Sequence, residues 1–199
     1  MRPKKNISLE ANSKLLDAAM HAFNRRGFTS ARTSEIAVMG DTSETAIFRM
    51  FKSKAGLANA CLQSCLESEF LFREDGIDLR LPAQHLFSKI CENQFNFFLR
   101  TPERYMFILV TPHYDFIDED NKLRLQQRRL DTFNVVRLLM KSGKIREQSV
   151  ELVHSIFIGS FTRLAISSFA GHLSVTNKDL QLMTAILWRA LGTEEKPND

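Results

Sequence analysis

The sequence predicts an all-α protein of nine helices, with a small N-terminal three-helix domain and a larger helical C-terminal domain. Three observations support this fold class. Apolar residues recur at the three- and four-residue spacing of a helix face. Serine, threonine or proline stands where most of the helices would begin, and glycine stands where several would end. No segment shows the alternation of a strand between hairpin turns.

The N-terminal domain is expected to span residues 1–54. Its first helix begins near Ser8 and ends at Gly27, which suits a positive φ. Two short helices follow, with Thr33 and Ser43 as their caps and Gly40-Asp41 as the turn between them. A short basic arm, Arg2, Lys4 and Lys5, precedes the first helix.

The C-terminal domain is expected to span residues 55–192, followed by a charged, disordered tail at 193–199. Ser53 caps a helix from Lys54 to about Phe72, which connects the two domains. Prolines and glycines delimit the later helices. Their expected ranges are 82–100, 102–110, 117–142, 149–170 and 176–191.

Composition is typical of a soluble globular protein, at 44% hydrophobic and 25% charged residues. No uninterrupted apolar run is long enough for a membrane span, and the basic N-terminus lacks the apolar core of a signal peptide, so we expect a cytoplasmic protein without membrane contact. The three cysteines, Cys61, Cys65 and Cys91, are interpreted as reduced structural residues. A metal or redox pair at Cys61 and Cys65 is the alternative, because they lie one helical turn apart.

Positive charge is concentrated at the N-terminal end. Residues 1–54 hold ten Lys or Arg against five Asp or Glu, a net charge of +5, whereas the remainder holds 17 against 18. This asymmetry favours a nucleic-acid-facing domain joined to a nearly neutral body, although an ordinary solvated surface would also explain it.

The stretch from Thr33 to Lys54 has the pattern of a helix-turn-helix. Its apolar residues fall on one side at helical spacing: Ile36, Ala37, Ile47 and Phe51. The rest of the second short helix must therefore face outward, as a recognition helix does. These outward positions are Glu44, Thr45, Phe48, Arg49 and Lys52.

Residues 15–57 resemble the tetracycline-repressor (TetR) family of bacterial transcription regulators. The matching pattern is Leu15-x-x-Ala18-Ala19-x-x-x-Phe23-x-x-x-Gly27-Phe28-x-x-x-x-Thr33, then Ile36-Ala37, then Ser43-x-x-x-Ile47-Phe48-x-x-Phe51-x-Ser53-Lys54-x-x-Leu57. The resemblance implies a DNA-binding domain and a C-terminal ligand-binding and dimerisation domain. It also implies a homodimer through the helices at 149–170 and 176–191 that would place two recognition helices on a palindromic double-stranded DNA operator.

Four positions depart from the family pattern. Asp41 stands where the family has the glycine of the turn, and Thr42 replaces the apolar residue after it. Phe48 replaces a tyrosine whose hydroxyl meets a phosphate, and Met50 replaces an aromatic residue or histidine. Loss of the hydroxyl is expected to weaken DNA binding by about 0.5–1.5 kcal/mol.

For the DNA-binding side chains, the chemistry of base edges predicts Arg49 on guanine, Glu44 on a cytosine amino group and Thr45 on a thymine methyl. Glu44 has an equally good explanation as an acidic residue in the first turn of a helix. Phosphate contacts are expected at the helix N-terminus and the lysines. The full predicted set is Thr33, Ser34, Ser43, Glu44, Thr45, Phe48, Arg49, Lys52, Lys54, Lys4 and Lys5.

The C-terminal domain is rich in phenylalanine at inward spacing, which by default is packed core. The family resemblance raises the alternative that part of this set lines a pocket for a small apolar or amphipathic effector. The candidate residues are Phe95, Phe98, Tyr105, His113, Phe133, Asn134, Arg137, His154, Phe157 and Phe161. An inward-facing Arg137 would indicate an anionic ligand.

The leading hypothesis is therefore a ligand-responsive DNA-binding repressor without a cofactor. The alternative is a helical protein-interaction module that keeps the fold but has lost sequence-specific DNA binding. An enzyme is not expected, since no nucleophile–base pattern, phosphate-binding glycine loop or zinc-ligand spacing occurs. The acidic cluster at Asp115, Asp118, Glu119 and Asp120 is explained by a helix N-terminus.

Overall fold

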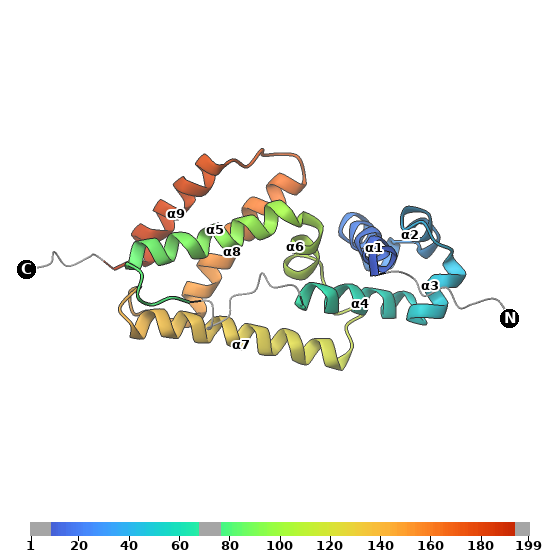
Figure 1. The fold of residues 1–199 in the computed structure, drawn as a ribbon, viewed down its shortest axis with the longest axis horizontal. Helices are drawn as coiled ribbons and strands as arrows, with labels where there is room; N and C mark the ends of the chain where they lie inside the picture. Colours follow the sequence, from blue (N-terminus) through green and yellow to red (C-terminus); the bar gives the residue numbers. More distant parts are fainter. Residues whose placement is uncertain (1–8, 68–76, 194–199) are drawn as a thin grey trace, which may run out of the picture. The chain divides into compact units, whose positions relative to one another are not determined.

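The structure, a computed structural model, describes residues 9–67 and 77–193. Within these ranges the chain forms nine α-helices and no strand, which confirms the predicted all-α fold (Figure 1). The helices are α1 (Leu9–Ser30), α2 (Thr33–Met39), α3 (Glu44–Phe51), α4 (Lys54–Leu66), α5 (Ala83–Arg100), α6 (Pro102–Leu109), α7 (Glu119–Lys141), α8 (Val150–Phe169) and α9 (Asn177–Leu191). The basic arm with Lys4 and Lys5, and the tail from residue 194, lie outside the described residues.

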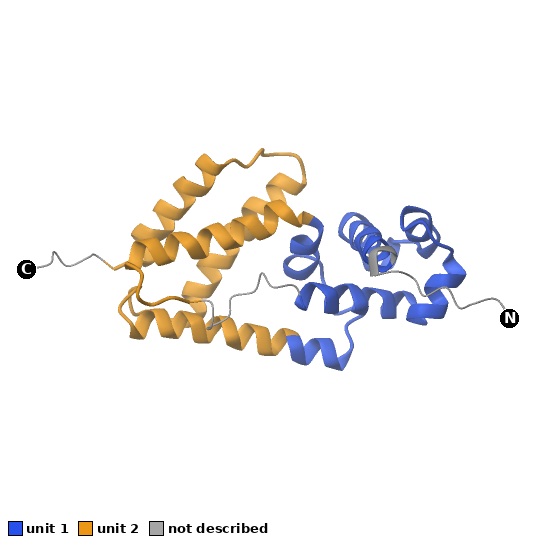
Figure 2. Cartoon of the chain, viewed as in Figure 1, with its two compact units in different colours: residues 1–68, 103–124 blue, residues 69–102, 125–199 orange. Residues whose placement is uncertain are grey.

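The chain divides into two compact units (Figure 2). Unit 1 comprises residues 1–68 and 103–124, and unit 2 comprises residues 69–102 and 125–199. These units are defined by which residues pack together, so their limits differ from those of the predicted functional domains at 1–54 and 55–192. The N-terminal helices share their core with α4, α6 and the start of α7, a helix whose residues from Leu125 onward belong to unit 2.

In unit 1, α1 packs against both α2 and α4, and α3 packs between α2 and α4. The apolar residues of the predicted stripes are buried, among them Leu15, Phe23, Ile36 and Ile47. This burial fixes the two short helices, which are too short to be stable alone.

Residues 103–124 are attached to the N-terminal helices by buried polar contacts. Asn59 on α4 donates to the carbonyl oxygen of Phe116 at 2.7 Å, and its own carbonyl oxygen accepts from the backbone N–H of Asp118 and the side chain of Asn121, both at 3.0 Å. Buried amides of this kind stabilise one arrangement, because an alternative packing would leave them unpaired. The Asn59 cluster therefore makes the start of α7 part of unit 1.

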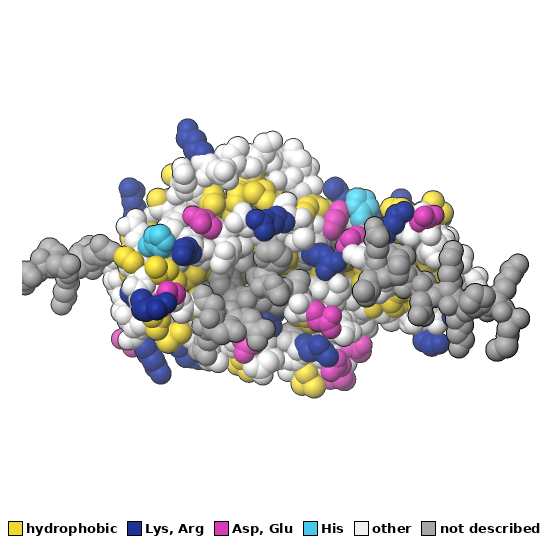
Figure 3. Space-filling model, viewed as in Figure 1, with side chains coloured by type: hydrophobic (Ala, Val, Ile, Leu, Met, Phe, Trp, Pro, Cys, Tyr) yellow, Lys and Arg dark blue, Asp and Glu magenta, His cyan; other side chains and the backbone are white. Residues whose placement is uncertain are grey.

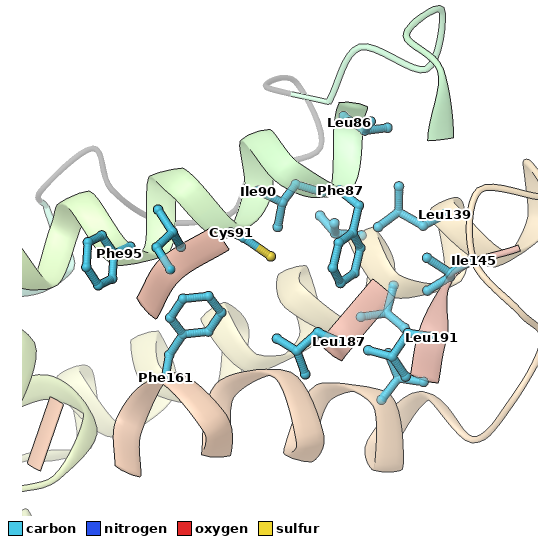
Figure 4. Close-up of a cluster of buried hydrophobic side chains, with 14 residues drawn as sticks. Leu86, Phe87, Ile90, Cys91, Phe95, Leu139, Ile145, Phe161, Leu187 and Leu191 are labelled. Atoms are coloured by element: carbon cyan, nitrogen blue, oxygen red, sulfur yellow. The ribbon is translucent and has the colours of Figure 1, made fainter. Parts of the chain in front are cut away.

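The core of unit 2 is formed by α5, α7, α8 and α9. Figure 4 shows Phe87 and Ile90 of α5 directed toward Leu139 and Ile145, with Leu187 and Leu191 of α9 beneath them. An apolar core of aliphatic and aromatic residues holds the helices together by burial of surface.

Most predicted helix limits agree with the structure to within about two residues. Gly143 and Gly171, which follow α7 and α8, have positive φ values of 68° and 76°. Gly27 also has a positive φ, 75°, but helical hydrogen bonding resumes after it and α1 extends to Ser30. Helix α4 ends at Leu66 rather than near Phe72, and the intervening stretch from residue 68 lies outside the described residues.

The predicted cap at Thr33 is wrong. Arg32 is the N-cap of α2 and offers no side-chain capping bond, while Thr33 is already the first helical residue. Its hydroxyl is used elsewhere, because it donates a hydrogen bond to the carboxylate of Glu44 on α3.

Candidate DNA-binding surface and ligand cavity

The outward face of α3 is built as predicted. Ser43 is its N-cap, accepting from the backbone N–H of Ala46 at 3.1 Å. Ile47 points inward and is fully buried. The five predicted outward residues are all exposed: Glu44, Thr45, Phe48, Arg49 and Lys52. A short amphipathic helix with its polar face in solvent has the form of a recognition helix.

Glu44 has a partner within the protein. Its carboxylate accepts from the hydroxyl of Thr33, which joins the first turns of α2 and α3. Both side chains border a shallow groove with Ser34, Phe48 and Lys54. Thr33 and Ser34 thus lie beside the recognition helix, at the N-terminus of α2 where backbone N–H groups favour an anion.

Lys54 makes a set of contacts that its sequence position did not reveal. Its ammonium donates to the carbonyl oxygens of Thr29 at 3.0 Å and Ala31 at 3.2 Å, and lies 4.8 Å from the centre of the Phe28 ring. Phe28 in turn packs on Phe116 at 4.9 Å. Lys54 therefore closes the end of α1 against the start of α4, with two of its three donors used.

The turn between α2 and α3 is arranged differently from the expectation. Gly40 has an ordinary φ of −82°, and Asp41 takes the positive φ of 54°. Close packing favours Gly40 instead, since a Cβ there would lie 2.8 Å from Leu15 Cδ1 and 3.2 Å from the backbone atoms Leu15 Cα and Ile36 O. Asp41 tolerates the left-handed region better than most residues, and it pairs with Lys14 at 3.5 Å on the surface.

Charge on the visible surface is mixed. On the face drawn in Figure 3, Lys and Arg side chains are interspersed with Asp and Glu rather than gathered in one patch. Local ion pairs neutralise part of the positive charge of the N-terminal end, for example the 2.6 Å pair between Arg26 and Glu35.

A small apolar cavity of about 40 Å³ lies in unit 2. Residues from α5, α7, α8 and α9, together with Ile145 between α7 and α8, form its wall: Phe87, Ile90, Thr132, Val135, Val136, Leu139, Ile145, Val153, His154, Phe157 and Leu191. Small-molecule pockets commonly measure about 300–1,000 Å³, so wall residues must move before a ligand of ordinary size can enter.

The predicted ligand set is only partly brought together by this cavity. His154 and Phe157 line it, and Phe133 and Phe161 pack directly behind them at ring-centre distances of 5.1 Å. Phe95 and Phe98 are buried but do not line it, while Asn134 and Arg137 are exposed and hydrogen-bonded to each other at 3.0 Å. Tyr105 and His113 belong to unit 1 and do not line this cavity.

Most of the cavity wall was missed because it is aliphatic. One signal was present in the sequence, since Thr132, Val135, Val136 and Leu139 follow the helical i, i+3, i+4, i+7 spacing.

Two histidines have lowered pKa values. Burial lowers the pKa of His113, whose ring Nε2 lies 2.7 Å from the carbonyl oxygen of Phe107 and must donate to it. Burial also lowers the pKa of His154, and the nearby positive charge of Arg129 adds to this effect. Both imidazoles are thus favoured in the neutral form.

The cysteines have the environment of structural residues. All three are buried, and none is in a disulfide with another described cysteine. Burial, and then the neighbouring Cys65, raise the pKa of Cys61, and burial raises that of Cys91 to about 12. Such thiols are poor nucleophiles. Among the described residues no group of three or more His, Cys, Asp or Glu side chains is placed to hold a metal ion.

The fold and the exposed recognition helix together define a helix-turn-helix DNA-binding protein with an additional helical unit. Comparison with known proteins agrees. The family model of bacterial regulatory proteins, tetR family, matches residues 15–61. A Bacillus subtilis (strain 168) protein described as the uncharacterized HTH-type transcriptional regulator YvkB is 45% identical over 51 residues, which are 26% of this chain and 27% of that protein.

Solved structures share the whole fold. A TetR-like transcriptional regulator from Rhodococcus sp. RHA1 has a TM-score of 0.67 at 20% identity, covering 90% of this chain and 94% of that one. The regulator FadR from Bacillus subtilis, solved in complex with stearoyl-CoA, has a TM-score of 0.63 at 13% identity, covering 89% and 95%. The N-terminal part of the chain, residues 15–61, thus matches the tetR family of bacterial regulatory proteins, where the sequence pattern predicted the resemblance.

Proposed function

We propose that this protein is a cytoplasmic transcriptional repressor that a small, largely apolar or amphipathic molecule releases from a palindromic DNA operator. The observation that carries the proposal is the family-matched helix-turn-helix, in which every predicted outward residue of α3 is exposed. The match of residues 15–61 to a family of DNA-binding regulators favours this function over the protein-interaction module.

On the DNA, Arg49 is the principal base-reading residue, because it is exposed and the guanidinium has the geometry for guanine. Thr45 lies one turn earlier on the same helix and contacts a thymine methyl. Lys52 and Ser34 contact phosphates. Glu44 holds Thr33 and orients the two short helices toward each other, with base contact as its secondary role.

The protein acts as a homodimer through α8 and α9. Helix α8 is apolar enough by length and composition to cross a membrane, yet only 17% of its apolar window is buried within the chain. A single helix of this kind is weak support for a membrane span, and a partner surface explains it as well. Leu152 on α8 and Leu182 and Ile186 on α9 are more than half exposed.

The effector binds in the cavity of unit 2, where the wall is apolar. The complex of FadR with stearoyl-CoA supplies a precedent for an amphipathic ligand on this fold. Helix α7 couples the cavity to the DNA-binding unit, because Thr132, Val135 and Leu139 line the cavity while Asn121, at the start of the same helix, is bonded to Asn59 of α4. A ligand that displaces α7 would shift the equilibrium between binding-competent and released states.

Selection from a random library of double-stranded DNA, followed by a mobility-shift titration over a salt series, tests the proposal. We expect an inverted-repeat site bound much more tightly than scrambled DNA at every salt concentration. Binding of all DNA with equal affinity would favour the protein-interaction module instead. Ile186→Glu is expected to yield a folded monomer, by light scattering and circular dichroism, that binds the site weakly.

A further inference from the structure

His154 is a polar group on an otherwise apolar cavity wall. Within residues 9–67 and 77–193, its imidazole makes no hydrogen bond, although it is half-buried. The other polar side chain of the wall, Thr132, already donates to the carbonyl oxygen of Arg128 at 3.1 Å. A partly buried imidazole without a partner is costly unless a ligand or water supplies one.

Two arginines lie next to this histidine. The His154 ring meets the face of Phe133 edge-on at 5.1 Å, and the guanidinium carbons of Arg129 and Arg137 lie 5.2 Å and 6.0 Å from the centre of the same Phe133 ring. Neither guanidinium forms an ion pair in the described part of the chain, and Arg137 bonds only to Asn134. The exposed carboxylate of Glu151 is near enough that both arginines contribute to the lowering of its pKa, but the contact that the two guanidiniums share is the face of the Phe133 ring.

A single exposed arginine that packs on Phe133 would be an ordinary feature of a helix surface. The combination is more specific, since the imidazole of His154 lines the apolar cavity and the two guanidiniums lie on the same Phe133 ring that His154 contacts. Guanidinium groups bind carboxylates and phosphates through paired hydrogen bonds, and an adjoining apolar wall favours a hydrocarbon chain. This chemistry matches an amphipathic anion.

We propose that Arg129, Arg137 and His154 bind the anionic head group of an amphipathic effector whose apolar chain enters the adjoining cavity. The inference rests on the proposed function and deepens it, because it assigns a negative charge to the effector and a location to that charge. The cavity widens on binding through Phe157, a wall residue that is only partly buried and packs against Phe161 at 5.1 Å.

Trp188, the one tryptophan of the chain, reports on this site. Its ring lies 5.5 Å from that of Phe87, which lines the cavity. We would titrate the full chain, without DNA, with decanoate, decyl phosphate and decanol below their micelle-forming concentrations and follow the tryptophan fluorescence. The anions are expected to bind at least tenfold more tightly than decanol, and the better of the two identifies a carboxylate or a phosphate head group.

Substitutions of the three proposed residues test where the anionic head group binds. The double substitution Arg129→Gln with Arg137→Gln is expected to reduce anion binding at least tenfold, to the level of decanol, and to leave decanol binding within twofold. His154→Phe is expected to weaken anion binding severalfold. The matched control is Arg100→Gln, an exposed arginine at the end of α5 that does not line the cavity, which is expected to change nothing.

Equal binding of decanol and the anions, absence of anion binding, or an anion preference that survives the double substitution would each overturn the inference. DNA binding is measured separately on the same preparations. A protein that binds its DNA site specifically but shows no anion preference refutes the inference alone, whereas a wild-type protein without specific DNA binding refutes the proposed function.

Discussion

Replacing Lys54 with methionine separates a structural role of this lysine from a phosphate contact. Methionine keeps most of the stem but removes the charge that reaches the carbonyl oxygens of Thr29 and Ala31 and the ring of Phe28. Hydrogen bonds to a charged group are worth about 1.5–3 kcal/mol each when buried. Because the Lys54 ammonium is only partly buried, solvent screening reduces the contribution of each bond. We therefore expect the free energy of unfolding to fall by about 1–3 kcal/mol in total.

The assay combines unfolding with a salt series of DNA binding. For a domain of this size, each kcal/mol lowers Tm by roughly 2–4 °C. Each lysine–phosphate contact contributes about 0.9 to the slope of log K against log salt concentration. For Lys54→Met we expect a clear loss of stability, weaker DNA binding and an unchanged salt slope. The control Lys52→Met, on an exposed lysine, is expected to lower the slope by about 0.9 while stability stays within about 0.5 kcal/mol.

The opposite pattern would refute the reasoning. Suppose that Lys54→Met kept full stability while its slope of log K against log salt concentration fell by about 0.9. The ammonium of Lys54 would then contact a phosphate in the complex, as the sequence predicted. The bonds to Thr29 and Ala31 would then belong to the DNA-free protein only.

Three further predictions concern single side chains. Phe48→Tyr supplies the missing hydroxyl on a ring that is 42% exposed, and it is expected to tighten DNA binding by about 0.5–1.5 kcal/mol, roughly 2- to 13-fold in Kd; weaker binding in the mobility-shift assay would count against the phosphate role. Asp41→Gly is expected to be more stable than Asp41→Ala by about 1 kcal/mol in urea unfolding, because only glycine adopts the φ of 54° without strain; equal stabilities would contradict this. Burial lowers the pKa of His113, so the unfolded chain binds the proton more readily and stability falls as pH drops below about 6.5, by at most about 1.4 kcal/mol per pH unit; His113→Gln is expected to flatten this dependence, and an unchanged slope would show that another group is responsible.

The helices were predictable because their limits depend on local chemistry. Ser43, Ser53 and Ser149 each accept a hydrogen bond from a backbone N–H three residues later, and Thr176 forms a capping box with Asp179. Such bonds involve residues close in sequence, so the pattern of residue types is sufficient.

Features that depend on long-range packing were not predictable. Gly40 looked like the residue of the turn with a positive φ, but its role comes from the approach of Leu15, 25 positions earlier. Lys54 and Phe116 likewise acquire their roles from Phe28. A sequence pattern shows which face of a helix is apolar, but not which distant side chain meets it.

The lining of the cavity was predicted in part for the same reason. Helical spacing placed His154 and Phe157 on the inward face of α8, and both line the cavity. Tyr105 and His113 shared the same aromatic character but pack in unit 1. Residue type alone did not distinguish the two cores.

The central claim, sequence-specific DNA binding by the exposed face of α3, is tested most directly by Arg49→Ala. The measurement is the ratio of Kd for scrambled DNA to Kd for the selected inverted repeat, at fixed salt concentration, for the wild type and the variant. Loss of a paired contact with guanine is expected to cost about 1–3 kcal/mol of specific binding free energy per contacted half-site, which lowers this ratio roughly 5- to 160-fold for each half-site. Discrimination at that base pair is expected to disappear. A variant with the wild-type ratio and the same preference at every base pair would contradict the account.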